Sequence, residues 1–172
     1  MFIFSRTVNP EPLNGEDMRS QRCYFPQEPD APRPLTVTVP RRVRFEEIDP
    51  LGMVWHGRYV SYLEDGRVAF GDRYGLRYTK FRDEGLAAPI LKMHIDYKAP
   101  LRFDEIMNIE TALHWSDAMR LNFEYHITGQ DGRLAATGYT VQLLTDMKGD
   151  VLLVPTAWIE DFRQKWRDGK LE

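Results

Sequence analysis

The chain has 172 residues, of which 42% are hydrophobic and 12% aromatic, a composition typical of one globular domain rather than of a disordered chain. Its formal net charge of −3 gives no electrostatic basis for binding nucleic acid or an acidic membrane surface. The single cysteine, Cys23, excludes an internal disulfide and a cysteine-rich metal site, and it favours the reducing cytoplasm. No apolar run approaches the ~20 residues of a membrane-spanning helix, and the opening MFIFSRTVNP becomes polar too soon to predict a signal peptide.

Proline is concentrated at the beginning of the chain, where residues 1–40 hold seven of the eleven prolines. Because proline lacks a backbone N–H and restricts the backbone torsions, residues 1–34 are predicted to form an irregular extension, either wrapped on the surface or disordered. We place the globular domain at residues 35–172.

The domain is predicted to begin with a strand and a long helix. The strand is LTVTVPRRVRF (35–45), which alternates and is rich in β-branched residues. A loop follows, and then GRYVSYLEDGRVAFGDRYG (57–75) repeats apolar residues at spacings of three and four. This pattern predicts a helix of four to five turns, with Gly71 and Gly75 as its stop signal. Its apolar residues cover more than one stripe, so the helix should be largely enclosed.

The rest of the chain is rich in predicted strands. Four apolar segments are bounded by turn residues: 89–100, 105–117, 119–130 and 133–146. VLLVPTAW (151–158) fits a short strand or loop, and AWIEDFRQKWRDG (157–169) fits a C-terminal helix. The order of one strand, one long helix and four antiparallel strands predicts an α+β fold whose sheet wraps around the helix.

Two motifs carry a resemblance to a known family. FEEIDPLGMVWHGRYVSYLEDGRVAF (45–70) holds an Asp, a short Gly turn, an apolar-aromatic pair and a Tyr at the start of the predicted helix. IDYKAPLRFDE (95–105) holds Asp-Tyr, a Pro three residues later and an acidic residue after a short loop. Both resemble the motifs of the 4-hydroxybenzoyl-CoA thioesterase family. The similarity covers roughly residues 36–146 and implies a hotdog fold, a long central helix in a curved antiparallel sheet.

The resemblance implies an acyl-CoA thioesterase that uses no metal or organic cofactor. In that family pattern Asp49 attacks the thioester carbon or activates a water molecule, and the backbone N–H of His56 polarises the carbonyl. A helix N-terminus suits this role, because its first N–H groups lack helical partners and carry partial positive charge. Gly57 would let substrate approach the backbone closely. The competing interpretation of Asp49 is that Asp-Pro pairs favour turns.

Four further residues near the helix start have two interpretations each. The His56 imidazole could titrate near neutral pH and orient Asp49, or only its backbone N–H matters. Trp55 could line an acyl pocket or fill the core, and Tyr59 is expected to pack more than to contact substrate. For Glu64 an ion pair is favoured over a catalytic role. Trp55, Gly57, Tyr59 and Glu64 are therefore the candidate substrate-binding residues. No metal site is expected, because the other histidines lack ligand spacing.

Three functions compete at this point. The first is hydrolysis of an acyl-CoA. The second is hydrolysis of thioesters on acyl carrier protein or of polyketide type, which would favour a basic rim that the net charge of −3 does not suggest. The third is a non-catalytic acyl-thioester binding or assembly protein, which has no need of Asp49. The resemblance also implies a homodimer or homotetramer, with the active site at the subunit interface.

Overall fold

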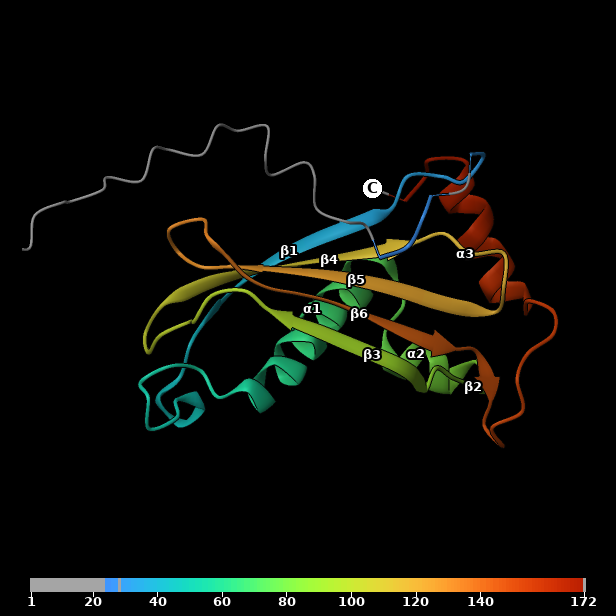
Figure 1. The fold of residues 1–172 in the computed structure, drawn as a ribbon. Helices are drawn as coiled ribbons and strands as arrows, with labels where there is room; N and C mark the ends of the chain where they lie inside the picture. Colours follow the sequence, from blue (N-terminus) through green and yellow to red (C-terminus); the bar gives the residue numbers. More distant parts are fainter. Residues whose placement is uncertain (1–23, 28, 172) are drawn as a thin grey trace, which may run out of the picture.

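The structure is a computed structural model that describes residues 24–27 and 29–171 (Figure 1). Residues 24–27 and 29–34 contain turns and bends but no helix or strand. The rest of the predicted extension, with Cys23, lies outside the described residues.

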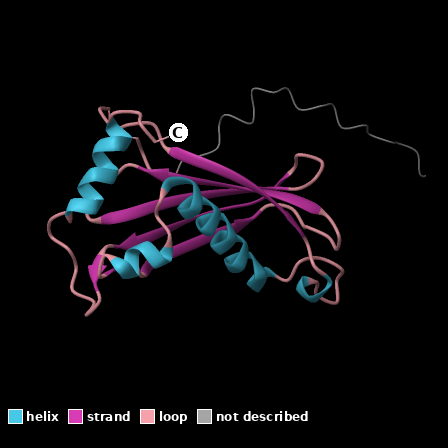
Figure 2. Ribbon diagram, turned by 180° about the vertical axis from the view of Figure 1, so that it is seen from behind, coloured by secondary structure: helices cyan, strands magenta, loops and turns pink. Residues whose placement is uncertain are grey.

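A five-stranded antiparallel sheet forms one layer, and a long helix lies across one of its faces (Figure 2). The spatial order is β1-β4-β5-β6-β3, so β1 and β3 are the edges. The strands are β1 (Leu35–Arg42), β3 (Ile90–Tyr97), β4 (Ile106–His114), β5 (Arg120–Thr128) and β6 (Leu134–Leu143). Each falls inside one of the predicted strands, which confirms them.

The long helix is α1 (Tyr59–Tyr74), preceded directly by the 3-10 turn η3 (His56–Arg58). It ends at Gly75, whose φ of 78° is a left-handed conformation that glycine adopts freely. Gly71 was predicted as part of the stop signal, but it lies inside the helix. A Cβ there would lie 2.7 Å from the carbonyl oxygen of Leu76, so Gly71 lets the chain fold back against the helix after it ends.

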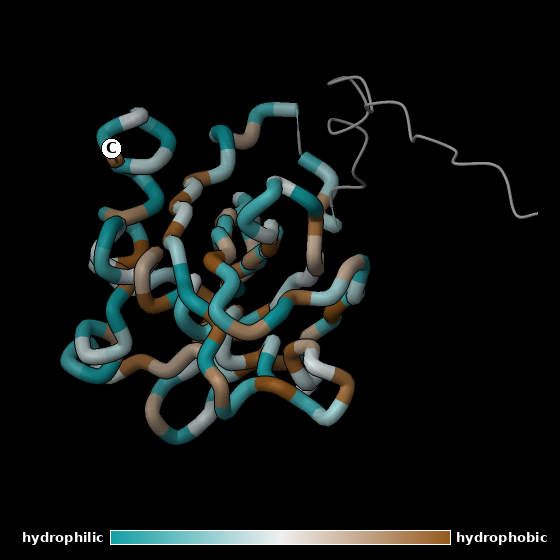
Figure 3. Tube along the Cα trace, turned by 90° about the vertical axis from the view of Figure 1, so that its left-hand side faces the viewer, coloured by the Kyte–Doolittle hydropathy of each residue, from teal (hydrophilic) through white to brown (hydrophobic). Residues whose placement is uncertain are grey.

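The core lies between α1 and the sheet. Hydrophobic and hydrophilic positions are interspersed along the chain (Figure 3), and β4 alternates between buried and exposed residues over most of its length. Phe70 of α1 packs edge-to-face on Phe123 of β5, with ring centroids 5.2 Å apart. Tyr62, Leu63 and Phe70 of the helix are almost fully buried, which agrees with the predicted enclosure of α1.

Several short elements complete the molecule. They are η2 (Phe45–Glu47), α2 (Tyr78–Asp83) and a two-stranded sheet of β2 (Leu86–Ala87) and β7 (Thr145–Asp146). The predicted C-terminal helix is confirmed as α3 (Ala157–Arg167). In the segment 151–158, Val151 forms a single bridge to Thr145 and the rest before α3 is loop. No helix in the described part of the chain is long and apolar enough to cross a membrane.

A buried carboxylate joins β1, α1 and the loop between them. Glu47 is 3% exposed, and its Oε1 lies 2.7 Å from Nη2 of Arg41 on β1. Its Oε2 accepts hydrogen bonds from the backbone N–H of Arg44 (2.8 Å) and from the hydroxyl of Tyr62 on α1 (3.1 Å). Its backbone carbonyl accepts the N–H of Trp55 at 2.9 Å. Glu47 therefore fixes both ends of the loop that carries Asp49.

The first prediction concerns the contact between α1 and β4. Alanine favours helix formation over glycine by about 1 kcal/mol, yet Gly66→Ala is expected to destabilise the protein. A Cβ on Gly66 would overlap Thr111 Oγ1 and lie 3.0 Å from Ile109 Cγ2, both in fully buried side chains. Because overpacking costs roughly 1–3 kcal/mol, we expect a net loss of about 1–2 kcal/mol in the free energy of unfolding, measured in urea. If the cost is equal in a Thr111→Ala background, the close contact is not its cause.

The second prediction concerns Glu47. Replacing it with glutamine removes the charge that Nη2 of the partly buried Arg41 binds and leaves only Asp65, 3.0 Å from its Nε, so Glu47→Gln should lower the free energy of unfolding by roughly 1–3 kcal/mol. The neighbouring Glu46 has an exposed side chain 3.9 Å from Arg44, and Glu46→Gln should cost less than about 0.5 kcal/mol. Equal, small losses in urea denaturation would show that the buried pair does not hold the loop.

Candidate active site

Asp49 lies in a tight turn that the local sequence explains. The N–H of Gly52 donates to the carbonyl of Asp49 at 2.9 Å, and the N–H of Asp49 donates to the carbonyl of Met53 at 2.9 Å. Pro50 occupies the second position of the turn, where its fixed φ is favoured, and Gly52 takes a φ of 74°. Asp49 is therefore a turn residue, as Asp-Pro pairs often are. This does not remove its side chain from the site.

The two carboxylate oxygens of Asp49 are in different situations. Oδ1 accepts hydrogen bonds from the backbone N–H groups of Leu51 at 2.8 Å and Met53 at 3.4 Å. Among the described residues no donor binds Oδ2. The turn thus orients the half-buried carboxylate through one oxygen and leaves the other available for a ligand or a water molecule.

The helical segment that follows begins with free donors. Trp55 is the residue before η3, and its side chain makes no cap hydrogen bond. Within the residues that the structure describes, the N–H groups of His56 and Gly57 have no protein acceptor, whereas the N–H of Arg58 donates to the carbonyl of Trp55 at 2.9 Å. Since η3 continues directly into α1, these N–H groups stand at the positive end of one continuous helical segment.

A cavity of about 320 Å³ brings the two sequence motifs together. It is lined by Asp49, Met53, Val54, His56, Tyr59, Tyr97, Lys98, Ala99 and Pro100. Val54 donates its N–H to the carbonyl of Leu101 at 2.9 Å, and Met53 forms a bridge with Arg102. The loop of the first motif is therefore hydrogen-bonded to the chain that follows β3, and residues 97–100 of the second motif line the same cavity.

Two tyrosines form one side of the cavity. Tyr59 is almost fully buried, and its ring packs edge-to-face on Tyr97 with centroids 5.0 Å apart. Burial, and then the proximity of Tyr97, raises the pKa of Tyr59 to about 12, so its hydroxyl stays protonated at neutral pH. The hydroxyl of Tyr97 donates to the backbone carbonyl of His56 at 3.0 Å. Tyr97 was not predicted from the sequence to be a site residue, although it belongs to the second motif (95–105).

Three of the predicted site residues do not line this cavity. Trp55 is 49% exposed and its ring covers Gly57, where a Cβ would overlap the ring. Glu64 forms an ion pair with Arg67 on the same helix. The structure thus brings Asp49, His56 and Tyr59 together in the cavity, while substrate contacts by Trp55, Gly57 and Glu64 stay predictions.

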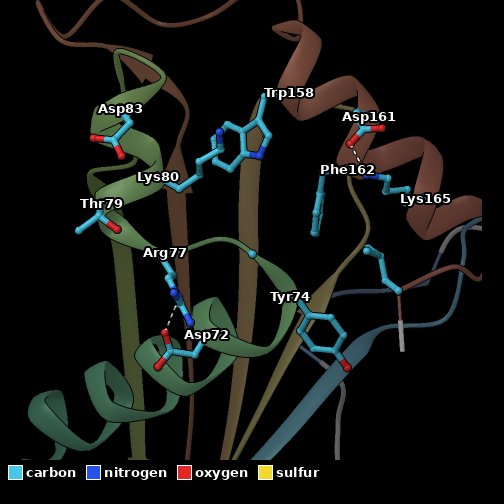
Figure 4. A pocket seen from close by; sticks show the side chains of 12 residues that line it. Asp72, Tyr74, Arg77, Thr79, Lys80, Asp83, Trp158, Asp161, Phe162 and Lys165 are labelled. Atoms are coloured by element: carbon cyan, nitrogen blue, oxygen red, sulfur yellow. Dashed lines mark hydrogen bonds and ion pairs between the residues drawn. The ribbon is translucent and has the colours of Figure 1, made fainter.

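A larger groove of about 570 Å³ lies between the end of α1, α2 and α3 (Figure 4). Charged residues along it pair with one another: Asp72 with Arg77 at 2.7 Å, and Asp161 with Lys165 at 2.6 Å. The groove holds no residue of the turn at Asp49. Among the described residues no group of three or more His, Cys, Asp or Glu side chains is arranged to hold a metal ion.

Comparison with known proteins agrees with the two motifs. The family model of the thioesterase-like superfamily matches residues 43–165. The acyl-CoA thioester hydrolase YbgC of Escherichia coli O157:H7 is 25% identical over 126 residues, which cover 73% of this chain and 94% of that protein. The acyl-acyl carrier protein thioesterase ATL2 of Arabidopsis thaliana is 30% identical over 105 residues, 59% of this chain and 56% of that protein.

The fold also has close structural neighbours. The crystal structure of a DHNA-CoA thioesterase from Staphylococcus aureus superposes with a TM-score of 0.71, covering 78% of this chain and 91% of that one. Its identity is 20%, so this likeness shows the hotdog fold alone. The chain therefore belongs to the thioesterase-like superfamily of hotdog-fold thioester hydrolases, the family that its two motifs resemble.

Proposed function

We propose that the protein hydrolyses acyl-CoA thioesters to a free acid and CoA in the cavity lined by Asp49 and His56. One observation carries the proposal: the carboxylate of Asp49 and the start of the η3–α1 helical segment face the same 320 Å³ cavity. A thioester carbonyl placed there would have a nucleophile or base on one side. Negative charge develops on the carbonyl oxygen during hydrolysis, and this oxygen would accept hydrogen bonds from the unpaired N–H groups at the helix start.

Two routes use the same residues. In the direct route a carboxylate oxygen of Asp49 bonds to the thioester carbon, the C–S bond breaks, and CoA leaves as a thiolate that takes up a proton. Water then hydrolyses the mixed anhydride. In the water route Asp49 accepts a proton from a water molecule that attacks the same carbon, and the C–S bond breaks to give the same products. In both routes the N–H of His56 would donate to the developing oxyanion.

The remaining candidate residues take lesser roles in this proposal. CoA is too large to fit within 320 Å³, so residues outside the cavity can contact the rest of the substrate, and we assign this role to Trp55. Gly57, which has no side chain, is assigned to letting the thioester approach the backbone at the helix start. Tyr59 is assigned to the cavity wall. Glu64, paired with Arg67, is assigned to stabilising α1. The whole site falls within residues 35–172, and the single cysteine suits a cytoplasmic enzyme.

The third prediction tests Asp49. Asp49→Asn should keep the turn, because the amide oxygen can accept the same backbone N–H groups, but it removes the charge. The rate of acyl-CoA hydrolysis, measured as the release of free thiol, should fall by a factor of about 10² to 10⁴. Asp146 is a matched control, since its Oδ1 accepts the N–H groups of Lys148 at 2.8 Å and of Asp150 at 3.0 Å, two and four residues later, and it does not line the cavity. Asp146→Asn should keep wild-type activity. Full activity in Asp49→Asn would remove Asp49 from the chemistry.

The same assay separates the competing functions. The substrate panel contains aromatic, short-chain and long-chain acyl-CoA thioesters together with acyl carrier protein thioesters, which the similarity to the Arabidopsis enzyme motivates. If the protein prefers carrier-protein thioesters, these and not acyl-CoA thioesters are its substrates. If wild type binds thioesters but hydrolyses none, the protein is a binding module and the enzymatic proposal fails.

The fourth prediction concerns assembly. We propose that β3, an edge strand with Leu91 67% exposed, pairs with a second copy to give a dimer or tetramer. Light scattering should therefore report at least twice the chain mass. Leu91→Asp places a charge in this contact and should shift the mass toward the monomer. Leu153, which is 90% exposed in the loop before α3, provides the control Leu153→Asp, which should keep the assembly. A monomeric wild type contradicts the proposal.

A further inference from the structure

The hydroxyl of Tyr97 holds the backbone at the start of the helical segment. Tyr97 is the last residue of β3, and its hydroxyl crosses to the carbonyl of His56, 41 positions earlier in the sequence, at 3.0 Å. Its ring is fixed edge-to-face against Tyr59 and lies 6.5 Å from the imidazole of His56. Tyr97 also lines the cavity beside Asp49. A strand residue thus reaches the peptide unit that joins His56 to Gly57.

The Tyr97 hydroxyl binds the carbonyl of the His56–Gly57 peptide, whereas the group that could bind an oxyanion is the N–H on the other side of the same peptide. In a trans peptide the C=O of His56 and the N–H of Gly57 belong to one rigid plane and point in opposite directions. The His56 carbonyl accepts both the hydroxyl of Tyr97 and the N–H of Tyr59. Fixing the carbonyl therefore fixes the N–H of Gly57. Hydrogen bonds accepted by a carbonyl also polarise the peptide and strengthen its N–H as a donor.

The local sequence does little to fix the orientation of the His56–Gly57 peptide. Helix ends fray, and Gly57 has no side chain to restrict its backbone torsions. The residue before η3 provides no side-chain cap. Trp55 covers Gly57 on one side, but its contact is apolar and does not orient the peptide plane. Among the described residues the hydroxyl of Tyr97 is the side-chain hydrogen bond that does so.

We propose that Tyr97 is a positioning residue for thioester hydrolysis, which orients the His56–Gly57 peptide so that the N–H of Gly57 joins that of His56 in binding the oxyanion. This role rests on the proposed function. Tyr97 acts through the backbone and need not touch the reacting atoms. Its hydroxyl is useful mainly when charge develops on the carbonyl oxygen, so its removal should affect kcat more than KM.

The fifth prediction tests this role with Tyr97→Phe, which keeps the ring and removes only the hydroxyl. Losing an oxyanion donor outright costs about 10² to 10³ in kcat. Since Tyr97 only orients a donor, we expect roughly a tenfold fall in kcat with KM within about twofold. The matched control is Tyr74→Phe, because the hydroxyl of Tyr74 donates to the backbone carbonyl of Thr36 at 2.8 Å, away from the cavity. Tyr74→Phe should keep wild-type kcat.

A second measurement does not depend on activity. In Tyr97→Phe the amide resonance of Gly57 should move upfield in a ¹H–¹⁵N spectrum, because its peptide loses a hydrogen bond at the carbonyl, whereas Tyr74→Phe should leave it in place. Wild-type kcat in Tyr97→Phe, or an unchanged Gly57 resonance, overturns the role of Tyr97 while leaving thioester hydrolysis intact. A wild type that hydrolyses no thioester overturns the proposed function and this role together.

Discussion

The site depends on the buried ion pair between Glu47 and Arg41. A carboxylate that is 3% exposed is costly to bury unless every oxygen is bound, and here Arg41, the N–H of Arg44 and the Tyr62 hydroxyl bind it. Because the same residue accepts the N–H of Trp55 through its backbone, the strand, the loop and the helix are fixed relative to one another. These contacts of Glu47 fix the position of Asp49 relative to the helix start.

The two sequence motifs supply complementary halves of the lining of one cavity. The first motif contributes a turn that holds one oxygen of Asp49 and a helix start whose first N–H groups find no acceptor in the described part of the chain. The second contributes Tyr97 and the chain after β3, which pairs with the turn through Val54 and Leu101. Turns and helix ends are among the more mobile parts of a fold. Here the second half continues directly from β3, and its hydrogen bond with Val54 adds a second link between the first half and the sheet, besides that of Glu47 to β1.

Repeating patterns were predictable from the sequence, and single contacts were not. The apolar spacing over residues 57–75 and the alternation in four later segments predicted α1 and the sheet. In contrast, α2, β2 and β7 are too short for a period to show. The Asp49 motif located the cavity. Glu47 and Tyr97 had no signal of comparable strength, because a buried carboxylate and a hydroxyl that reaches a distant carbonyl depend on tertiary packing alone.

The described end of the N-terminal segment limits how copies of this protein can stack. Tyr24 donates its hydroxyl to Asp96 and lies 2.8 Å from Thr137 Oγ1, and its ring packs on Tyr139. Since neighbouring side chains of a strand alternate between faces, and Thr140 of β6 points toward the core beside Tyr125, Thr137 and Tyr139 lie on the face away from α1. Two dimers that stacked back to back over this part of β3 and β6 would first have to displace Tyr24.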